Sequence, residues 1–326
     1  PVASQTGPDF AASLPTNGYG WWYVDALSDC GQHGLTMIAM LGCVFSPWYA
    51  WARAAGRRRV DPLEHSGLNL ALYGAAGHRW TLTERGAADV ARSADRLTIG
   101  RSSLHWDGVA LQAEIDEITS PWPTRLQGRL RLIPQTLIGN GHDIDREGAH
   151  RWYPIAAQAR IEVEFTHPQL RWQGHAYFDA NQGLRPLEDD FRSWNWSRAA
   201  LADHARVYYD TEWRGGGGTS LALRFDASGT HACDPPPQRT LPRTMWGIER
   251  MTRCDTTAEA SVKETLENGP FYARSLVDTT VDGHRTLAFH ESVSLERFAS
   301  RWVQTLLPVR LPRRPLRRRD QTVPLR

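Results

Sequence analysis

Residues 159–165 read ARIEVEF, and this stretch decides the fold class because apolar and charged residues alternate through it. Ile161, Val163 and Phe165 are separated by Glu162 and Glu164. Successive side chains of a β-strand point to opposite faces, so this pattern predicts a strand with one apolar face and one polar face. A half-buried strand is therefore expected here.

The same period of two recurs on both sides of this stretch. It is found in residues 67–73 (GLNLALY), 126–132 (LQGRLRL) and 221–225 (LALRF), with turn residues such as Ala-Ser-Gly at 227–229 between segments. Helical periodicity is confined to residues 295–307. The expected fold is all-β, built from sandwiches or barrels with few helices.

Residues 35–52 (LTMIAMLGCVFSPWYAWA) carry no charge and are about long enough to cross a bilayer as a helix. Pro47 lies within the stretch, Gly42 and Ser46 interrupt it, and the preceding GWWYVDALSD (20–29) is typical of a strand. The favoured prediction is a pair of strands buried on both faces and joined near Ser46. A membrane helix is the alternative.

The chain length allows two domains of ordinary size, since 326 residues with 41% hydrophobic content can bury a sizeable core. The charged, Gly-containing stretch at 139–148 (GNGHDIDREG) is the predicted boundary, which gives domains 1–145 and 146–309. Residues 310–326 hold seven arginines against one aspartate, Asp320. This basic tail is expected to be an exposed arm resting on an anionic membrane surface, or else a solvated terminus.

The four cysteines lie far apart without a CxxC pair, so they are predicted to be buried free thiols and not a zinc site or a disulfide scaffold. The sequence shows no basic, apolar and small-residue series of a signal peptide, and a cytoplasmic location is expected.

Two pairs of residues carry the candidate chemistry. His150 and Trp152 are two positions apart, as are Tyr177 and Asp179, so each pair projects from one face of a strand. If the two strands line one cavity, an imidazole, an indole, a phenol and a carboxyl group meet there. Without further information a Tyr-x-Asp pair is typical of a turn cap, His150 of a surface position and Trp152 of a core position.

Four stretches resemble one known family. They are GYGWWYVDALSDCGQHGLTMIAMLGCVFSPWY (18–49), DPLEHSGLNLALYG (61–74), HRWYPIAAQARIEVEF (150–165) and YFDANQGLRPLEDDFRSWNWSR (177–198). They resemble the carotenoid 1,2-hydratases, also called hydroxyneurosporene synthases, and the resemblance covers most of the chain. It implies two lipocalin-like β-barrel domains and a role in spheroidene and spirilloxanthin biosynthesis in purple photosynthetic bacteria.

The resemblance also implies an active site. Asp179 of the YFDAN motif is expected to be the acid, with Tyr177, His150 and Trp152 as its neighbours, and all four positions match. Burial would keep the Asp179 carboxyl protonated, so that it can protonate C2 of the terminal isoprene unit. The ring faces of Trp152 and Tyr177 would stabilise the cation at C1, and His150 would take the proton of the attacking water. No metal and no redox cofactor is expected.

The implied partners are an acyclic carotenoid and water, with peripheral contact to the inner photosynthetic membrane and no nucleic acid; the oligomeric state stays open. Three rival functions remain. A non-catalytic lipid carrier would use the same pocket without an acid, and a lipocalin-like terpenoid cyclase or pericyclase would exclude water. A glycoside hydrolase would need a second carboxylate across the cavity from Asp179.

The run that begins at Asp179 also imitates a calcium loop. It fails because Gly183 and Leu184 occupy the fifth and sixth positions, which need an oxygen ligand and a glycine. The acidic cluster that follows is expected to pair with neighbouring arginines in a structural network. Its members are Glu188, Asp189 and Asp190, and the candidate partners are Arg185, Arg192 and Arg198.

Overall fold

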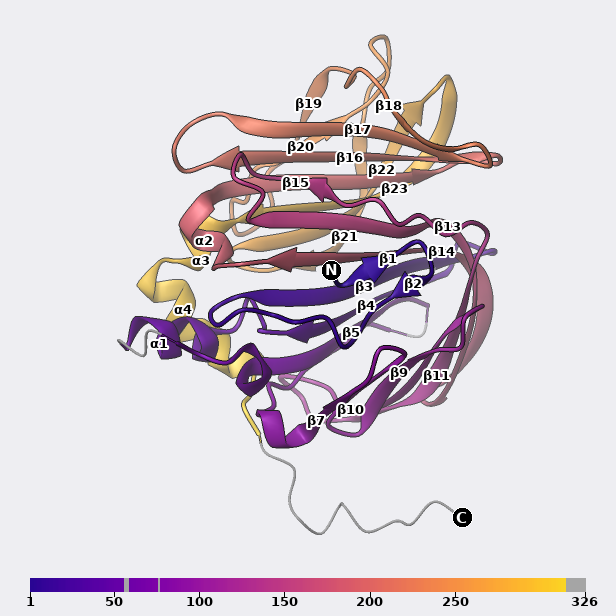
Figure 1. Ribbon diagram of the computed structural model, residues 1–326. Helices are drawn as coiled ribbons and strands as arrows, with labels where there is room; N and C mark the ends of the chain where they lie inside the picture. Colours follow the sequence, from indigo (N-terminus) through magenta and orange to yellow (C-terminus); the bar gives the residue numbers. More distant parts are fainter. Residues whose placement is uncertain (56–58, 76, 315–326) are drawn as a thin grey trace.

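The computed structural model describes residues 1–55, 59–75 and 77–314 of the chain. Antiparallel strands dominate it, which confirms the predicted all-β class. Figure 1 shows two large sheets lying one against the other, with the helices gathered at one side.

The first sheet has twelve strands and holds most of the N-terminal half of the chain. Its spatial order is β6-β5-β4-β3-β14-β13-β11-β10-β9-β8-β7, and β12 pairs with β13. The strands are β3 (Tyr19–Ser28), β4 (His33–Leu41), β5 (Ser66–Gly74), β6 (Arg79–Leu82), β7 (Val90–Arg92), β8 (Arg96–Ile99), β9 (Ser102–Trp106), β10 (Leu111–Ile118), β11 (Arg125–Pro134), β12 (His142–Asp143), β13 (His150–His167) and β14 (Gln169–Gly183).

The second sheet has seven strands in the order β18-β17-β16-β15-β23-β22-β21. The strands are β15 (Phe191–Ala200), β16 (His204–Trp213), β17 (Gly218–Asp226), β18 (Gly229–Ala232), β21 (Ser261–Asn268), β22 (Tyr272–Val281) and β23 (His284–Ser294). Two small pairs complete the β structure: β1 (Ala3–Ser4) with β2 (Gly7–Pro8), and β19 (Gln238–Leu241) with β20 (Arg250–Arg253).

The four stretches with alternating residues all form strands, as predicted, within β5, β11, β13 and β17. The expectation that residues 67–73 are half-buried is wrong, because β5 is buried on both faces. Leu68, Leu70 and Leu72 pack in the core enclosed by the first sheet, whereas Ala71 and Tyr73 pack in the core between the two sheets.

Residues 35–52 form one strand and one helix. The first part is β4, as predicted, but the expected second strand is wrong because α1 (Pro47–Ala54) follows. The Oγ atom of Ser46 accepts hydrogen bonds from the backbone N–H groups of Trp48 and Tyr49, and Pro47 takes the first helical position. A serine cap followed by proline is a helix start, so the features that were read as an interruption begin the helix. None of the described helices is both long and apolar enough to span a bilayer.

The helix predicted at 295–307 is present as two short helices, α3 (Leu295–Phe298) and α4 (Arg301–Arg310). The remaining helical segments are α2 (Leu187–Asp190) and the 3₁₀ turns η1 (Pro62–His65) and η2 (Ala87–Asp89). In Figure 1 the helices α1 to α4 cluster at one end of the two sheets, and α1 contacts α4.

The sheets change between β14 and β15, at residues 184–190. The strands β13 and β14 come after the expected boundary at 145/146 in the sequence. They nevertheless belong to the first sheet, because β14 pairs with β3. The division into folding units at 1–145 and 146–309 stays a prediction.

The start of the basic tail is docked on the protein at residues 310–314, although Arg313 and Arg314 are exposed. Arg313 forms an ion pair with the buried Glu84 at 2.7 Å, and the Arg310 guanidinium lies 4.1 Å from the ring centre of Trp80. Residues 315–326, which carry the rest of the predicted arm, lie outside the described residues.

All four cysteines are free thiols, as predicted, but only two of them are buried. Cys43 and Cys254 lie in the interior, whereas Cys30 is exposed and Cys233 is half-buried, so burial was wrongly predicted for the latter two. Cys30 lies just after the end of β3, and Cys233 directly follows β18.

Candidate active site

Asp179 lies in the core between the two sheets. Its Cα is opposite Tyr23 of β3 and Pro154 of β13, near the middle of the first sheet. The alternate residues Tyr177 of β14 and Tyr23 of β3 face the second sheet, while Phe178 faces the core of the first. The alternation of the strands therefore directs Asp179 into the layer between the sheets, where only 4% of it is exposed.

The two oxygens of the Asp179 carboxyl have different surroundings. Trp152 Nε1 donates to Oδ2 at 2.7 Å, and the Tyr177 hydroxyl donates to the same oxygen at 2.8 Å. Oδ1 is buried and has no hydrogen-bond partner among the described residues. Because both donors occupy Oδ2, a proton on the carboxyl group belongs on Oδ1.

Burial raises the pKa of Asp179 to about 8, and the two hydrogen bonds oppose this shift without cancelling it. The carboxyl group is therefore largely protonated at neutral pH. A neutral carboxylic acid with its proton on an unpartnered oxygen is suited to donate that proton to a bound molecule.

Aromatic rings surround this acid. The Trp152 indole is approached edge-on by Tyr209 and Phe225, with ring centres 5.7 and 6.5 Å away. The Tyr177 ring lies 5.3 Å from that of Trp196. Rings so placed exclude water and present π faces that attract positive charge.

His150 is the one predicted site residue that the structure keeps apart from the others. Its Cα is opposite Gly183, four positions along β14 from Asp179, which corresponds to about 13 Å. Both ring nitrogens are engaged: Nδ1 with the Tyr19 hydroxyl at 2.8 Å and Nε2 with Asp190 at 2.6 Å. Burial lowers the pKa of His150. The structure thus brings Asp179, Trp152 and Tyr177 together and places His150 in a separate hydrogen-bonded chain.

The acidic cluster forms ion pairs, in agreement with the predicted structural network, although only one predicted partner is used. Asp190 pairs with Arg185 at 2.6 Å, while Glu188 pairs with Arg53 of α1 at 2.6 Å. The other candidate arginines pair elsewhere: Arg192 with Glu296 and Arg198 with Asp25. Among the described residues, no group of three or more His, Cys, Asp or Glu side chains is placed to hold a metal ion.

A cavity of about 140 Å³ lies between the sheets on the side of β3 and β4. Most of its lining is aromatic and aliphatic: Trp21, Ile38, Met40, Val44, Phe45, Trp80, Leu82, Trp194, Phe271, Leu307 and Leu311. Its polar lining includes Tyr23, Tyr272, Arg274, Glu267 and Glu291. Asp179 does not line the cavity, but its cross-strand neighbour Tyr23 does.

The polar part of this cavity was missed by the sequence analysis. Tyr23 shares one face of its strand with Trp21 and Asp25, because the three are spaced two positions apart. Tyr177 has the same spacing relative to Asp179, so the same pattern could have identified Tyr23. Arg274 and Glu291 carry no local signal. They meet because β22 and β23 pair in a register that only the folded sheet fixes.

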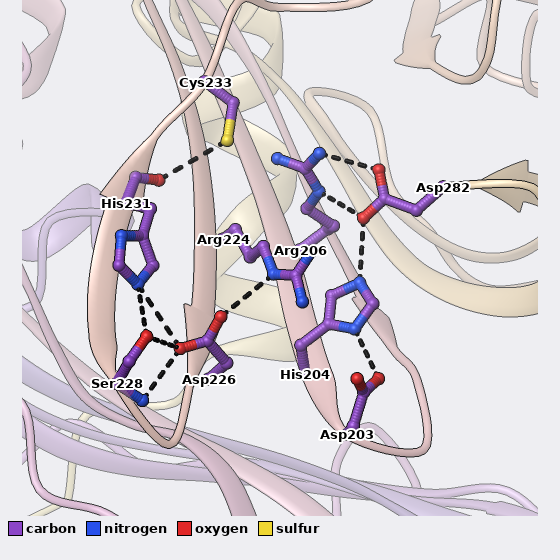
Figure 2. A network of polar contacts seen from close by, with 9 residues as sticks. All are labelled: Asp203, His204, Arg206, Arg224, Asp226, Ser228, His231, Cys233 and Asp282. Atoms are coloured by element: carbon purple, nitrogen blue, oxygen red, sulfur yellow. Dashed lines mark hydrogen bonds and ion pairs between the residues drawn. The ribbon is translucent and has the colours of Figure 1, made fainter.

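A second polar cluster lies at one end of the second sheet, and Figure 2 shows it. His231 Nε2 faces both Ser228 at 2.9 Å and Asp226 at 3.3 Å in the turn between β17 and β18. A catalytic triad uses one imidazole nitrogen for the serine and the other for the carboxylate, so this cluster is not one. Nearby, Asp282 accepts from His204 and Arg206 and thereby joins two hairpin ends.

The two stacked antiparallel β-sheets give the chain a lipocalin-like fold, and solved structures agree with this fold. A protein described as AttH from Nitrosomonas europaea superimposes with a TM-score of 0.59 at 14% identity, over 86% of this chain and 92% of that one. CghA, solved with Sch210972, gives a TM-score of 0.55 at 9% identity over 88% and 94%. These likenesses show the fold.

The family model for carotenoid hydratase CrtC matches residues 37–320, and the chain belongs to this family; it is an enzyme of the hydratase class. Relatives named acyclic carotenoid 1,2-hydratase include that of Thiocapsa roseopersicina, 52% identical over 94% of this chain and 76% of that protein. The one from Rubrivivax gelatinosus is 47% identical over the same shares. The one from Cereibacter sphaeroides is 42% identical over 86% of this chain and 98% of its own.

Proposed function

We propose that this protein adds water across the terminal C1–C2 double bond of acyclic carotenoids such as neurosporene and lycopene, and that Asp179 is the acid. The names of its relatives support the reaction class. The observation that carries the mechanism is the Asp179 carboxyl, with a pKa near 8 and a buried Oδ1 that has no partner among the described residues.

The first step is protonation of the alkene. The O–H bond at Oδ1 breaks and a C–H bond forms at C2, which leaves a tertiary cation at C1 and an Asp179 carboxylate. An isolated alkene is a weak base, so the acid must be neutral and aimed at the substrate before the reaction begins. The donors Trp152 and Tyr177 then stabilise the carboxylate through the hydrogen bonds they already make to Oδ2.

The second step is capture of the cation by water. Ring faces of Trp152, Tyr177 and Trp196 stabilise positive charge near the acid, an interaction of about 2 kcal/mol when desolvated. The water oxygen bonds to C1 and loses one proton, and a proton returns to Asp179 at the end of the cycle. The atoms balance without an oxidant, a reductant or a cofactor.

His150 was expected to take the proton of the water, and that role stays a prediction. Its engaged nitrogens and its distance along the strand favour a positioning role, in which Tyr19, His150 and Asp190 hold the start of β13 against α2 and β15. Replacement of His150 distinguishes its role as a base from its positioning role.

The cavity is the proposed route of the polyene, since its lining is mainly apolar and it reaches Tyr23 beside the acid. Leu307, Arg310 and Leu311, from α4 and the residue after it, line the cavity where it meets the helices. A carotenoid dissolves in lipid, so this end of the protein is where contact with a bilayer would deliver the substrate.

We propose that α4 makes this peripheral contact with an anionic membrane. Trp302, Leu306 and Val309 recur at helical spacing and are 47%, 45% and 71% exposed, so they form an apolar stripe on the solvent face of α4. Trp51 of α1 is 39% exposed, and the exposed Arg301 adds positive charge beside the stripe. Tryptophan and arginine flanking an apolar helix face are typical of a helix that lies in a membrane interface.

The test is incubation of the purified protein with lycopene or neurosporene in water enriched in ¹⁸O. The expected product is a 1-hydroxy carotenoid that has gained one water and carries the heavy oxygen. Label taken from molecular oxygen would contradict the proposal. A cyclised product without added oxygen would indicate a cyclase, and bound but unchanged carotenoid would indicate a carrier.

A further inference from the structure

We propose that Glu291 binds the attacking water and takes its proton, and that the hydroxyl groups of Tyr23 and Tyr272 hold this water in the cavity. The inference rests on the proposed hydration reaction and assigns the base that the reaction needs. Three residues that line the same cavity, each with an oxygen atom that accepts no hydrogen bond from a described residue, carry it.

Glu291 has one oxygen bound and one oxygen free. It lies on β23, opposite Arg274 of β22. Arg274 donates to its Oε1 through Nε at 2.9 Å and Nη2 at 2.7 Å. No described residue forms a hydrogen bond with Oε2, and the residue lines the cavity. A carboxylate held on one oxygen by arginine presents the other oxygen as a fixed acceptor.

The other carboxylate of the cavity cannot play this part. Glu267 accepts from the Tyr73 hydroxyl on Oε1 at 2.5 Å and from Trp80 Nε1 on Oε2 at 3.0 Å. Both of its oxygens are therefore occupied by protein donors. Among the described acidic residues that line the cavity, Glu291 alone has an oxygen that receives no hydrogen bond from the protein.

Two tyrosine hydroxyls complete the site. The hydroxyl oxygens of Tyr23 and Tyr272 are buried and have no hydrogen-bond partner among the described residues. Both rings lie against the Arg274 guanidinium, at 5.6 and 5.2 Å from ring centre to Cζ, so Arg274 positions the tyrosines together with Glu291. Buried polar groups without protein partners are normally satisfied by water, and two hydroxyls with one carboxylate oxygen give a water the partners it needs.

This water site borders the acid. Tyr23 is directly opposite Asp179 across β3 and β14, which places their Cβ atoms about 5 Å apart. On the second sheet Glu291 is opposite Trp196, whose ring centre lies 5.6 Å from that of Tyr23. Asp179 from the first sheet and Glu291 from the second thus face one region between the sheets.

The chemistry balances with these two groups. Asp179 loses its proton to C2, the water oxygen bonds to C1, and an O–H bond of that water breaks as its proton passes to Glu291. The proton then moves from Glu291 to the Asp179 carboxylate through a second water, and both groups return to their starting states.

The test is Glu291→Gln assayed with lycopene in D2O. The amide keeps an acceptor for Arg274 but is a poor base, so hydration is expected to fall by about 10²-fold. Asp179 can still deliver a deuteron, and the cation then loses a proton to restore an alkene. The unhydrated carotenoid is therefore expected to gain deuterium at a rate within about threefold of the parent's.

Glu117→Gln is the matched control, because it removes a buried carboxyl group that does not line the cavity; it is expected to leave the ratio of hydration to deuterium uptake unchanged. Tyr23→Phe removes only a hydroxyl without a protein partner and is expected to lower the same ratio by about tenfold. Unchanged hydration in Glu291→Gln overturns the inference, as does an equal loss of hydration and deuterium uptake in a folded variant. Failure of the proposed reaction itself is distinguishable, since the parent would then neither hydrate nor exchange.

Discussion

The indole N–H of Trp152 lies 2.7 Å from Oδ2 of Asp179 and donates a hydrogen bond to it across β13 and β14. Tyr177 donates to the same oxygen, so the position of the Asp179 proton is set by its neighbours before any substrate arrives.

Replacing Asp179 by asparagine should abolish hydration while preserving the fold. The amide keeps the size of the side chain and an acceptor for Trp152 but has no proton to transfer, so the rate of hydration is expected to fall by about 10²- to 10⁴-fold. Product analysis measures the rate, and circular dichroism with thermal melting checks the fold. Near-normal turnover would contradict the assignment of Asp179 as the acid.

The rate of hydration should fall as the pH rises through about 8, the pKa of Asp179, because only the protonated acid is active. The relevant measurement is kcat/KM for hydration from about pH 6 to about pH 10. If the rate instead fell near about pH 4, where an ordinary carboxyl group titrates, the pKa of the acid would not be raised by burial.

Stability should change in the same direction. The folded pKa of Asp179 lies above its unfolded value, so its contribution to stability is complete below about pH 4 and is lost as the pH rises to about 8. The melting temperature of the parent should therefore decline across this window more than that of the Asp179→Asn variant. If the melting temperatures of the two proteins changed with pH in parallel, Asp179 would not be a buried, protonated carboxyl group.

Replacing His150 by alanine should affect the fold more than the chemistry. The substitution leaves Tyr19 and Asp190 without their buried partner, which costs about 1–3 kcal/mol and lowers the melting temperature by several degrees. Hydration at a temperature where the variant is folded should stay within about tenfold of the parent. Asp190→Asn, which weakens the same chain, serves as the matched control. If His150 is instead the base, hydration should collapse in His150→Ala and persist in Asp190→Asn.

The apolar stripe of α4 should govern binding to anionic vesicles. Replacing Trp302, Leu306 and Val309 by serine removes the apolar surface. The apparent affinity for the vesicles, measured from the bound fraction in a sedimentation assay, is expected to fall by at least about tenfold. The control is the double variant Val109→Ser and Leu184→Ser, which removes exposed apolar side chains away from α4. Unchanged binding of the triple variant would exclude this face, and a shift from dimer to monomer would show that a second copy covers it.

Part of this molecule could be predicted from local patterns. The alternation in residues 159–165 and its equivalents fixed the β-strands, because a period of two is compatible with a half-buried strand and with no helix. The motif spacing also directed Trp152, Tyr177 and Asp179 to one face, and the structure joins these three residues by hydrogen bonds. The helix at 47–54 was missed because aromatic residues suit strands, whereas the cap that begins a helix is a contact of Ser46 with the backbone that follows it.

The tertiary structure alone decided what surrounds the acid. Local sequence determined which residues share a face of a strand, since that depends on backbone geometry. It did not determine that His150 pairs with Tyr19 and Asp190, nor that Arg274 of the other sheet lies against Tyr23, the cross-strand neighbour of Asp179. Such contacts join residues at least 40 positions apart, and they depend on strand register and on how two sheets stack. Both are set by the packing of the whole core, because many small burial and hydrogen-bond terms must be satisfied together.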